Sequence, residues 1–158
     1  MTEIEKETDE APFVPGYLLY LLAAASDAAS SQFHAQARKA GLRVPEWRVL
    51  ACLFDDDGSM ITQLARAALV EQSRLTRIIV QMEERGLVTR RNDPDDGRRV
   101  RVFLTDTGRA IVTELVPQAR RHEAELMDLL RPEQAAMLKP TLQSLLAALE
   151  GDEKKQFP

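Results

Sequence analysis

Residues 61–104 read ITQLARAALVEQSRLTRIIVQMEERGLVTRRNDPDDGRRVRVFL, and this stretch decides the fold. Apolar residues recur at helical spacing in its first half, in a short helix from residue 61 and a second helix from about residue 71. Glu71, Gln72 and Ser73 supply the start of the second helix. Gly86 is suited to end it, since a residue without a Cβ adopts the left-handed backbone at little cost. We therefore predict two helices joined by a tight turn.

A β-hairpin is predicted directly after the second helix. Its strands cover residues 87–91 and 100–104, where valine and leucine alternate with Arg101 and Phe103. The intervening NDPDDGRR contains proline and glycine, which are typical of turns, and two adjacent arginines. Two helices, a tight turn and an arginine-tipped hairpin make a winged helix-turn-helix, a module that places its second helix in the DNA major groove.

Further helices are predicted on the N-terminal side of this module. Residues 16–40 are rich in alanine and leucine at helical spacing, and Gly41 ends that helix. Residues 45–54 form another helix, because Pro45 is well suited to a first helical turn. The fold class is therefore mainly α with a small β-wing.

Two longer helices are predicted on the C-terminal side. The first runs from its N-cap Thr105 toward residue 130, and the second runs from Pro132 toward residue 150. Pro117 and Pro140 fall inside these helices, where a proline kinks the helix or interrupts its hydrogen bonding.

Composition excludes several classes of protein. The chain has 158 residues, 44% hydrophobic and 5% aromatic, which fits one mainly helical folded unit. No apolar run approaches the roughly 18 residues of a membrane span, and the N-terminus is acidic where a secretory signal would be basic, so we expect a cytoplasmic protein without membrane contact. One cysteine and two histidines predict no disulfide, metal or cofactor. No phosphate loop or nucleophile with a base is present, so no enzyme is expected.

The net charge of −4 argues at first against nucleic acid as a partner. Its distribution weakens that objection, because residues 71–104 contain eight arginines against six acidic residues and carry +2, while the rest carries −6. Residues 1–12 hold five acids and one lysine, the composition of a disordered tail. A locally basic surface on an acidic protein is compatible with sequence-specific DNA binding.

The second helix of the module has the two faces that a recognition helix requires. Its apolar stripe, which we expect to pack on the protein, is Leu75, Ile78, Ile79 and Met82. The side chains expected to meet DNA are Gln72, Ser73, Arg74, Thr76 and Arg77, joined by Thr62 and Gln63 of the preceding helix. Arg74 and Arg77 can each form bidentate hydrogen bonds to guanine. The alternative is an ordinary amphipathic helix with a solvated polar face.

The hairpin tip suits the minor groove, whose negative potential and narrow width favour arginine. Arg98 and Arg99 are the candidates. The neighbouring acids Asp93, Asp95 and Asp96 would repel phosphate, so we expect them to hold an arginine by ion pairing and to shape the loop. The alternative is a charged, solvated tip without a functional role.

These segments together resemble the MarR family of bacterial transcriptional regulators. The resemblance is carried by ITQLA, SRLTRIIVQMEERGLV and DPDDGRRVRVFLTDTG, and the flanking helices extend it over nearly the whole chain. Two positions depart from the family pattern. Leu69 stands in the turn where many members have glycine, and Gly97 stands where many have a charged residue.

The resemblance implies a homodimer on double-stranded DNA, with two recognition helices in successive major grooves of a pseudo-palindromic operator. The leucines of the last helix and the apolar first helix agree, since they exceed what one winged-helix core can bury. The organisation we predict is a disordered acidic tail at 1–12, an N-terminal dimerisation helix at 13–43, a winged helix-turn-helix DNA-binding domain at 44–104, C-terminal dimerisation helices at 105–150 and a frayed tail at 151–158.

The resemblance also implies a pocket for a small aromatic or phenolic effector between the DNA-binding lobe and the dimer helices. The candidate lining residues are Phe33, His34, Trp47, Arg48 and Cys52. Arg48 or His34 would meet a carboxylate and Trp47 would stack on a ring. The alternative for Trp47 is a place in the core or an interface, and for His34 a place at the surface or an interface.

The leading hypothesis is therefore a homodimeric repressor that an effector releases from its operator. A thiol-based redox sensor acting through Cys52 is an alternative. Another is a winged-helix module that binds proteins, which would suit the net negative charge.

Overall fold

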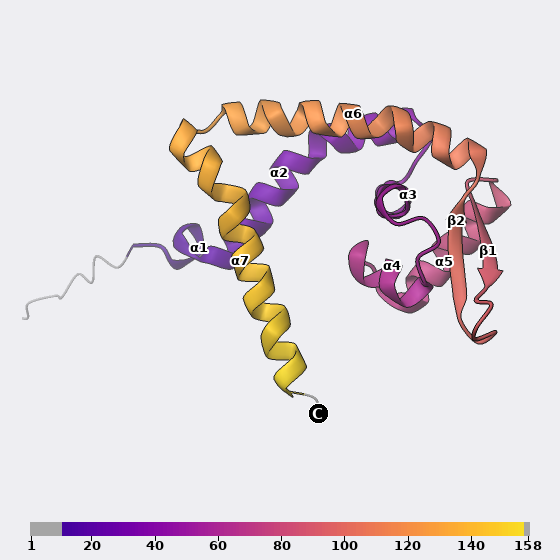
Figure 1. Cartoon of the computed structure of the whole chain (residues 1–158). Coiled ribbons are helices and arrows are strands. Elements are labelled where there is room, and N and C mark those ends of the chain that lie inside the picture. The colour runs from indigo at the N-terminus through magenta and orange to yellow at the C-terminus, as the bar shows by residue number, and fades with distance from the viewer. Residues whose placement is uncertain (1–10, 157–158) are drawn as a thin grey trace, which may run out of the picture.

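The structure is a computed structural model that describes residues 11–156. Along the chain it contains α1 (Phe13–Gly16), α2 (Leu18–Lys39), α3 (Val44–Asp55), α4 (Ile61–Ala67), α5 (Gln72–Glu84), β1 (Val88–Asn92), β2 (Val100–Leu104), α6 (Asp106–Asp128) and α7 (Pro132–Gln156). In Figure 1, α3, α4, α5 and the hairpin gather into one lobe, while α6 leads away from it and α7 turns back from the far end of α6. The chain is therefore a winged helix-turn-helix lobe carried on long helices.

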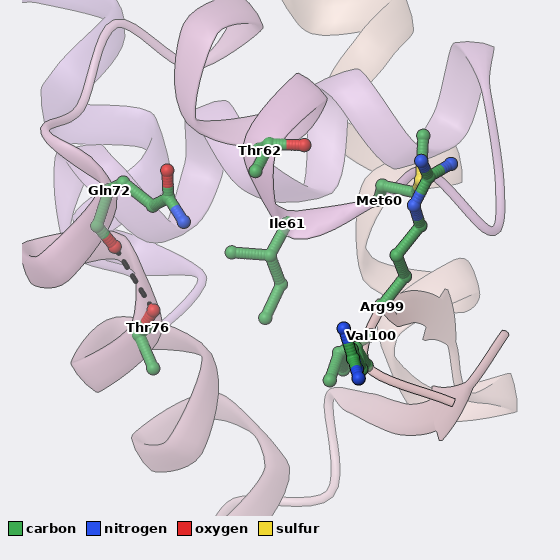
Figure 2. A pocket seen from close by; sticks show the side chains of 8 residues that line it. Met60, Ile61, Thr62, Gln72, Thr76, Arg99 and Val100 are labelled. Atoms are coloured by element: carbon green, nitrogen blue, oxygen red, sulfur yellow. Dashed lines mark hydrogen bonds between the residues drawn. The ribbon is translucent and has the colours of Figure 1, made fainter. Parts of the chain in front are cut away.

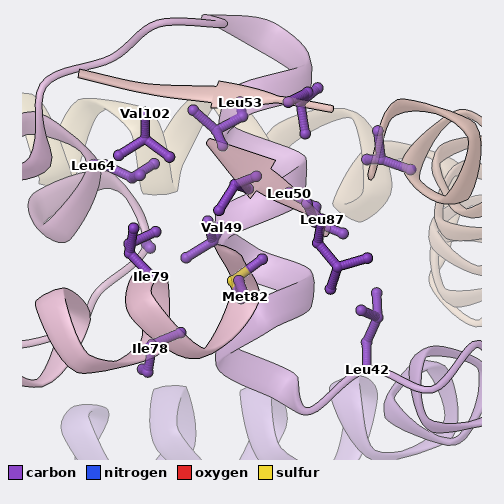
Figure 3. Packing of buried hydrophobic residues seen from close by; sticks show 14 of the residues in the cluster. Leu42, Val49, Leu50, Leu53, Leu64, Ile78, Ile79, Met82, Leu87 and Val102 are labelled. Carbon is purple, nitrogen blue, oxygen red and sulfur yellow. The ribbon is translucent and has the colours of Figure 1, made fainter. Parts of the chain in front are cut away.

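The hydrophobic core lies inside this lobe (Figure 3). Its fully buried side chains come from all three lobe helices and the hairpin, and α6 covers it with Val112 and Leu115. The predicted stripe of α5 is in the core, since Leu75, Ile79 and Met82 have no exposed surface. Burying each large apolar side chain contributes about 1.5–3 kcal/mol, so α5 is fixed to the lobe along its whole inner face.

The wing is a two-stranded antiparallel sheet in which Val88 pairs with Leu104 and Asn92 pairs with Val100. The segment before α4 adds to its open edge, because the amide of Gly58 donates to the carbonyl of Val102 at 3.0 Å. Gly58 has a φ of +90°, and a Cβ there would lie 2.7 Å from the Phe103 ring. A glycine is therefore needed where this segment meets the wing.

Several element boundaries differ from the sequence-based predictions. The first helix is interrupted at Tyr17, whose extended backbone (ψ 122°) separates α1 from α2. The first strand starts one residue later than predicted, at Val88. The last helix does not end near residue 150 but continues to Gln156. The predicted disordered tail at 1–12 lies almost entirely outside the described residues.

The departure from the family pattern at Leu69 has a structural cost. Leu69 lies in the turn between α4 and α5 with a φ of +57°, a left-handed conformation that costs a residue with a Cβ about 1–2 kcal/mol. Its side chain is 80% exposed, so little packing offsets this cost. The turn keeps the left-handed geometry in which many relatives carry glycine.

Replacing Leu69 by glycine is expected to raise the free energy of unfolding by about 0.5–1 kcal/mol, because glycine relieves the strain but gains freedom in the unfolded chain. The measurement is urea denaturation followed by circular dichroism. Leu69→Ala is the matched control, since alanine keeps the Cβ and the strain and should leave the midpoint nearly unchanged. A glycine variant less stable than the alanine variant would contradict this account.

Two surfaces of the long helices expose large apolar side chains. One is at the start of the helical region and comprises Phe13, Val14, Tyr17, Leu18, Leu19, Tyr20 and Leu21. The other follows the end of α6 and α7 and comprises Leu129, Leu130, Met137, Leu138, Leu145, Leu146 and Leu149. We call these the N-terminal and C-terminal apolar surfaces. Clusters of exposed apolar side chains of this kind usually mark interaction sites.

Candidate nucleic-acid interface

Both ends of helix α5 are defined by specific residues, Glu71 at its start and Gly86 after its last turn. The carboxylate of Glu71 accepts hydrogen bonds from the amides of Ser73 at 3.0 Å and Arg74 at 3.1 Å, so it caps the first turn. Hydrogen bonds from Ser73 and Arg74 lower the pKa of Glu71, which keeps the cap ionised. Gly86, with a φ of +71°, follows the last turn as predicted.

The outward face of α5 carries the side chains predicted to meet DNA. All five are exposed: Gln72, Ser73, Arg74, Thr76 and Arg77. The two hydroxyl groups are already engaged, because Ser73 donates to the Glu71 carboxylate and Thr76 donates to the carbonyl of Gln72 at 3.0 Å. Among the described residues, the side-chain donors on this face that have no hydrogen-bond partner are therefore the amide of Gln72 and the two guanidinium groups.

The wing is organised around the buried carboxylate of Asp93, which is 6% exposed. It accepts from the amides of Asp95 at 2.8 Å and Asp96 at 3.2 Å and from Nε of Arg101. The hydrogen bond from Arg101, followed by those backbone amides, lowers the pKa of Asp93. Arg101 also donates to the carbonyl of Gly58 at 2.9 Å. These contacts fasten the wing to the segment that precedes α4.

The prediction that the wing acids hold an arginine is correct for Asp93 and Asp96, but the arginine held by Asp93 is Arg101. Asp96 pairs with Arg99, at 3.4 Å, and accepts the backbone amide of Arg98 at 3.0 Å. The loop backbone that carries both tip arginines is therefore ordered by carboxylates.

A groove of about 560 Å³ lies between α5 and the wing (Figure 2). It is lined by Met60, Ile61, Thr62, Gln72, Thr76, Arg98, Arg99 and Val100. Five of the nine predicted DNA-contacting residues therefore meet in one groove, and Ser73, Arg74 and Arg77 are exposed on the same helix.

Four predicted contacts lie outside the groove, the three exposed residues of α5 and Gln63, and three lining residues escaped prediction. Gln63 accepts the amide of Met60 at 3.4 Å and so contributes to the cap of α4. The apolar groove residues Met60, Ile61 and Val100 were missed, because in the sequence they resemble ordinary core positions.

The eight arginines of residues 71–104 fall into distinct groups. Four pair with carboxylates: Arg85, Arg90, Arg99 and Arg101. Arg91 places its guanidinium 4.9 Å from the centre of the Phe103 ring. Within residues 11–156, no carboxylate lies at ion-pair distance from the remaining three, Arg74, Arg77 and Arg98. These three cations are available to an anionic partner.

The C-terminal end of α5 is held by the buried carboxylate of Glu46, a residue that sequence reasoning did not single out. Arg85, which follows α5, donates to both carboxylate oxygens at 2.9 Å and also to the carbonyl of Gly41 at 2.6 Å. Arg43 donates to Glu46 at 2.8 Å and to Gln81 of α5 at 2.6 Å. Burial alone would raise the pKa of Glu46, but hydrogen bonds from Arg43 and Arg85 outweigh it and lower that pKa. The sequence signal that could have identified Glu46 is its position three residues after Arg43 at the start of a helix, which is the spacing of a capping box.

A second pocket, of about 390 Å³, lies between α2, α3 and α6. It brings together four of the five predicted lining residues, Phe33, His34, Trp47 and Arg48, but not Cys52, and His122 is an addition from α6. The rings of Phe33 and Trp47 are 5.0 Å apart, and His122 stacks on Phe33 at 6.1 Å. His122 donates through Nε2 to the carbonyl of Ala29 at 2.7 Å, which ties α6 to α2.

The chemistry of this second pocket is aromatic with one permanent cation, Arg48. Burial, then the charges of Arg48 and Arg38, lower the pKa of His34. His34 is therefore neutral at pH 7. Glu123, which also lines the pocket, is paired with Lys139 of α7 at 2.7 Å. An aromatic ring with a carboxylate would match both the rings and the cation.

Cys52 does not line the pocket and lies half-buried in α3 beside the core. Burial raises the pKa of its thiol, and the nearby carboxylate of Asp55 adds to the shift. Because thiolate is the species that peroxide attacks, this environment gives the redox alternative no support.

Among the residues that the structure describes, no group of three His, Cys, Asp or Glu side chains is placed to hold a metal ion. Over the same part of the chain, no helix has the length and apolar character that crossing a bilayer requires.

The fold and the exposed face of α5 define the chain as a winged helix-turn-helix protein of the transcriptional-regulator class. The MarR family model matches residues 42–100. The crystal structure of a MarR family transcriptional regulator from Silicibacter pomeroyi DSS-3 is 57% identical, covers 87% of this chain and 98% of its own, and superposes with a TM-score of 0.80. The chain therefore belongs to the MarR family.

Two other relatives are informative. The HTH-type transcriptional repressor IacR of Pseudomonas putida is 38% identical over 71 residues, which span 45% of this chain and only 42% of that repressor. BpsR of Bordetella bronchiseptica, whose DNA binding is regulated by 6-hydroxynicotinic acid, is 24% identical, covers 86% of this chain and 97% of its own, and has a TM-score of 0.75. The likeness to BpsR is one of fold.

Proposed function

We propose that the protein is a homodimeric repressor that binds a pseudo-palindromic operator and is released by a small aromatic acid. The observation that carries this proposal is the placement of Arg74, Arg77 and Arg98 along α5 and the adjoining wing, where none of them forms an ion pair within residues 11–156. The two on α5 are assigned to guanines in the major groove, and Arg98, with Arg99 beside it, to the minor groove. The net charge of −4 does not oppose this, because these three cations have no ion-pair partner in the part of the chain that the structure describes.

The dimer is proposed to form through the N-terminal and C-terminal apolar surfaces, so that residues 13–43 and 105–150 are the dimerisation elements and 44–104 the DNA-binding domain. Both surfaces lie on helices outside the lobe core. Burying them between two copies removes apolar area from water and pairs two recognition helices on one face. Sedimentation equilibrium should give twice the chain mass, and a monomer at micromolar concentration would contradict the proposal.

DNA binding is tested by a footprint on the DNA upstream of the protein's own gene. A symmetric dimer should protect a two-fold symmetric site whose half-sites are separated by about one helical turn, roughly 10 base pairs. An unprotected region, together with no selection from a random duplex library, would contradict the proposal and favour a protein-binding role.

The effector is proposed to bind between α2, α3 and α6, with its carboxylate on Arg48 and its ring against Trp47. Residues of α2 and α3 line this pocket, and the corner between the same two helices is tied to the end of α5 by Glu46 and Arg85. An acid that alters the packing of α2 on α3 would therefore change the position of the recognition helix.

Replacing Arg48 by alanine is expected to weaken binding of benzoic acid and 6-hydroxynicotinic acid at least about tenfold, because a charge-assisted hydrogen bond contributes about 1.5–3 kcal/mol. Trp47 is the only tryptophan, so quenching of its emission reports binding directly. Arg131→Ala removes the same charge outside the pocket and serves as the control. Unchanged emission of the wild-type protein with both acids, or equal affinities of wild type and R48A, would refute this assignment.

A further inference from the structure

The hydroxyl group of Thr76 donates its proton within the protein. It donates to the carbonyl of Gln72, one helical turn earlier, at 3.0 Å, and Figure 2 shows this bond at the edge of the groove. A threonine in a helix has few χ1 rotamers, so this hydrogen bond fixes the orientation of the whole side chain. Because Thr76 is exposed and lines the groove, what it offers to a bound molecule is its methyl group.

The surroundings of that methyl group are apolar. Met60, Ile61 and Val100 line the same groove from the segment before α4, from α4 and from β2, as Figure 2 shows. Arg98 and Arg99 lie at the wing edge and make that edge of the groove cationic. The groove therefore combines a cationic edge with apolar side chains opposite Thr76.

Only one base offers a matching apolar group in the major groove. Thymine presents its C5-methyl group there, whereas the other bases present hydrogen-bond donors and acceptors alone at the equivalent edge. We propose that Thr76 is a specificity-determining residue that reads a thymine in each half-site through contact between the two methyl groups. This inference rests on the proposed DNA-binding function of the groove.

The test removes the methyl group from either side of the contact. A duplex selected by the wild-type protein from a random library is prepared with deoxyuridine replacing each thymine of one half-site in turn, and affinities are measured by fluorescence anisotropy. At one position, uracil should lower wild-type affinity about fourfold, the value expected for one buried methyl group. Thr76→Ser removes the contact in both half-sites, so it should lose about sixteenfold on the thymine duplex and no longer distinguish uracil from thymine at that position.

Thr76→Val separates the methyl group from the hydroxyl group. Valine keeps a methyl and lacks the hydroxyl, so T76V should still discriminate against uracil. Thr113→Ser, an exposed threonine of α6, is the matched control and should behave as wild type. Circular dichroism melts establish that each variant is folded.

Each contrary outcome has one meaning. If T76S still distinguishes uracil from thymine and T76V does not, the hydroxyl group makes the contact and the inference is wrong. Wild-type binding that is indifferent to uracil at every position would refute the methyl contact while leaving DNA binding intact. A failure to select any duplex would refute the proposed function and the inference together.

Discussion

Replacing Arg77 by alanine is expected to lower operator affinity at least about thirtyfold. A bidentate arginine contact to guanine contributes about 1–3 kcal/mol of discrimination, and a symmetric dimer loses it in both half-sites. Arg77 is exposed on α5, and within the described residues it forms no ion pair. Its loss therefore removes a contact with DNA and no contact that stabilises the fold.

Electrophoretic mobility shifts or fluorescence anisotropy at fixed salt measure this effect. Arg77→Lys keeps the charge without the planar pair of donors and should fall between wild type and R77A on the operator, while matching wild type on nonspecific DNA. Arg120→Ala removes an equal charge from the exposed surface of α6 and should bind normally. Equal affinity of R77A and wild type for the operator would show that Arg77 does not contact bases.

Replacing Glu46 by alanine or glutamine is expected to lower the free energy of unfolding by about 2–4 kcal/mol. Its carboxylate is fully buried and accepts from two guanidinium groups, and hydrogen bonds to charged groups contribute about 1.5–3 kcal/mol. Breaking a fully buried pair costs about 3–5 kcal/mol, but Arg43 and Arg85 keep 59% and 44% of their side-chain surface exposed and can be hydrated after the change. The loss should therefore fall below that upper range.

The same carboxylate predicts a dependence of stability on pH. Because the pKa of Glu46 is lower in the folded protein than its usual value of 4.5, its contribution is present above that value and is lost as pH falls through the folded pKa. Urea denaturation between pH 3 and 7 should show that the free energy of unfolding falls more steeply toward low pH for wild type than for E46Q. Glu84→Gln, an exposed residue of α5, is the control and should retain the wild-type curve. Parallel curves for wild type and E46Q would contradict this role.

Much of the interface could be predicted because its signals are local in the sequence. The inward and outward faces of α5 follow from helical spacing, and the glycine after its last turn follows from backbone freedom. The wing follows from alternation around a turn. Each depends on residues a few positions apart, and the structure confirms each of them.

The remaining features depend on residues far apart in the chain. Glu46 and Arg85 are separated by 39 positions in the sequence. Arg101 is separated by 43 positions from Gly58, whose carbonyl accepts its hydrogen bond. No periodicity reports such pairs, so the arginine held by Asp93 could not be distinguished in advance from its neighbours at the wing tip. The break at Tyr17 also escaped prediction, because the leucine and alanine content continues through it.

The central claim is that three unpaired arginines make the DNA-reading face. It is tested most directly by the triple variant R74A/R77A/R98A, compared with R120A/R121A/R131A, which removes the same charge from the surface of α6 and the residues that follow it. Circular dichroism should show both variants folded. We expect the first to lose specific operator binding in fluorescence anisotropy and the second to bind as wild type. A folded R74A/R77A/R98A variant with full operator affinity would contradict the claim.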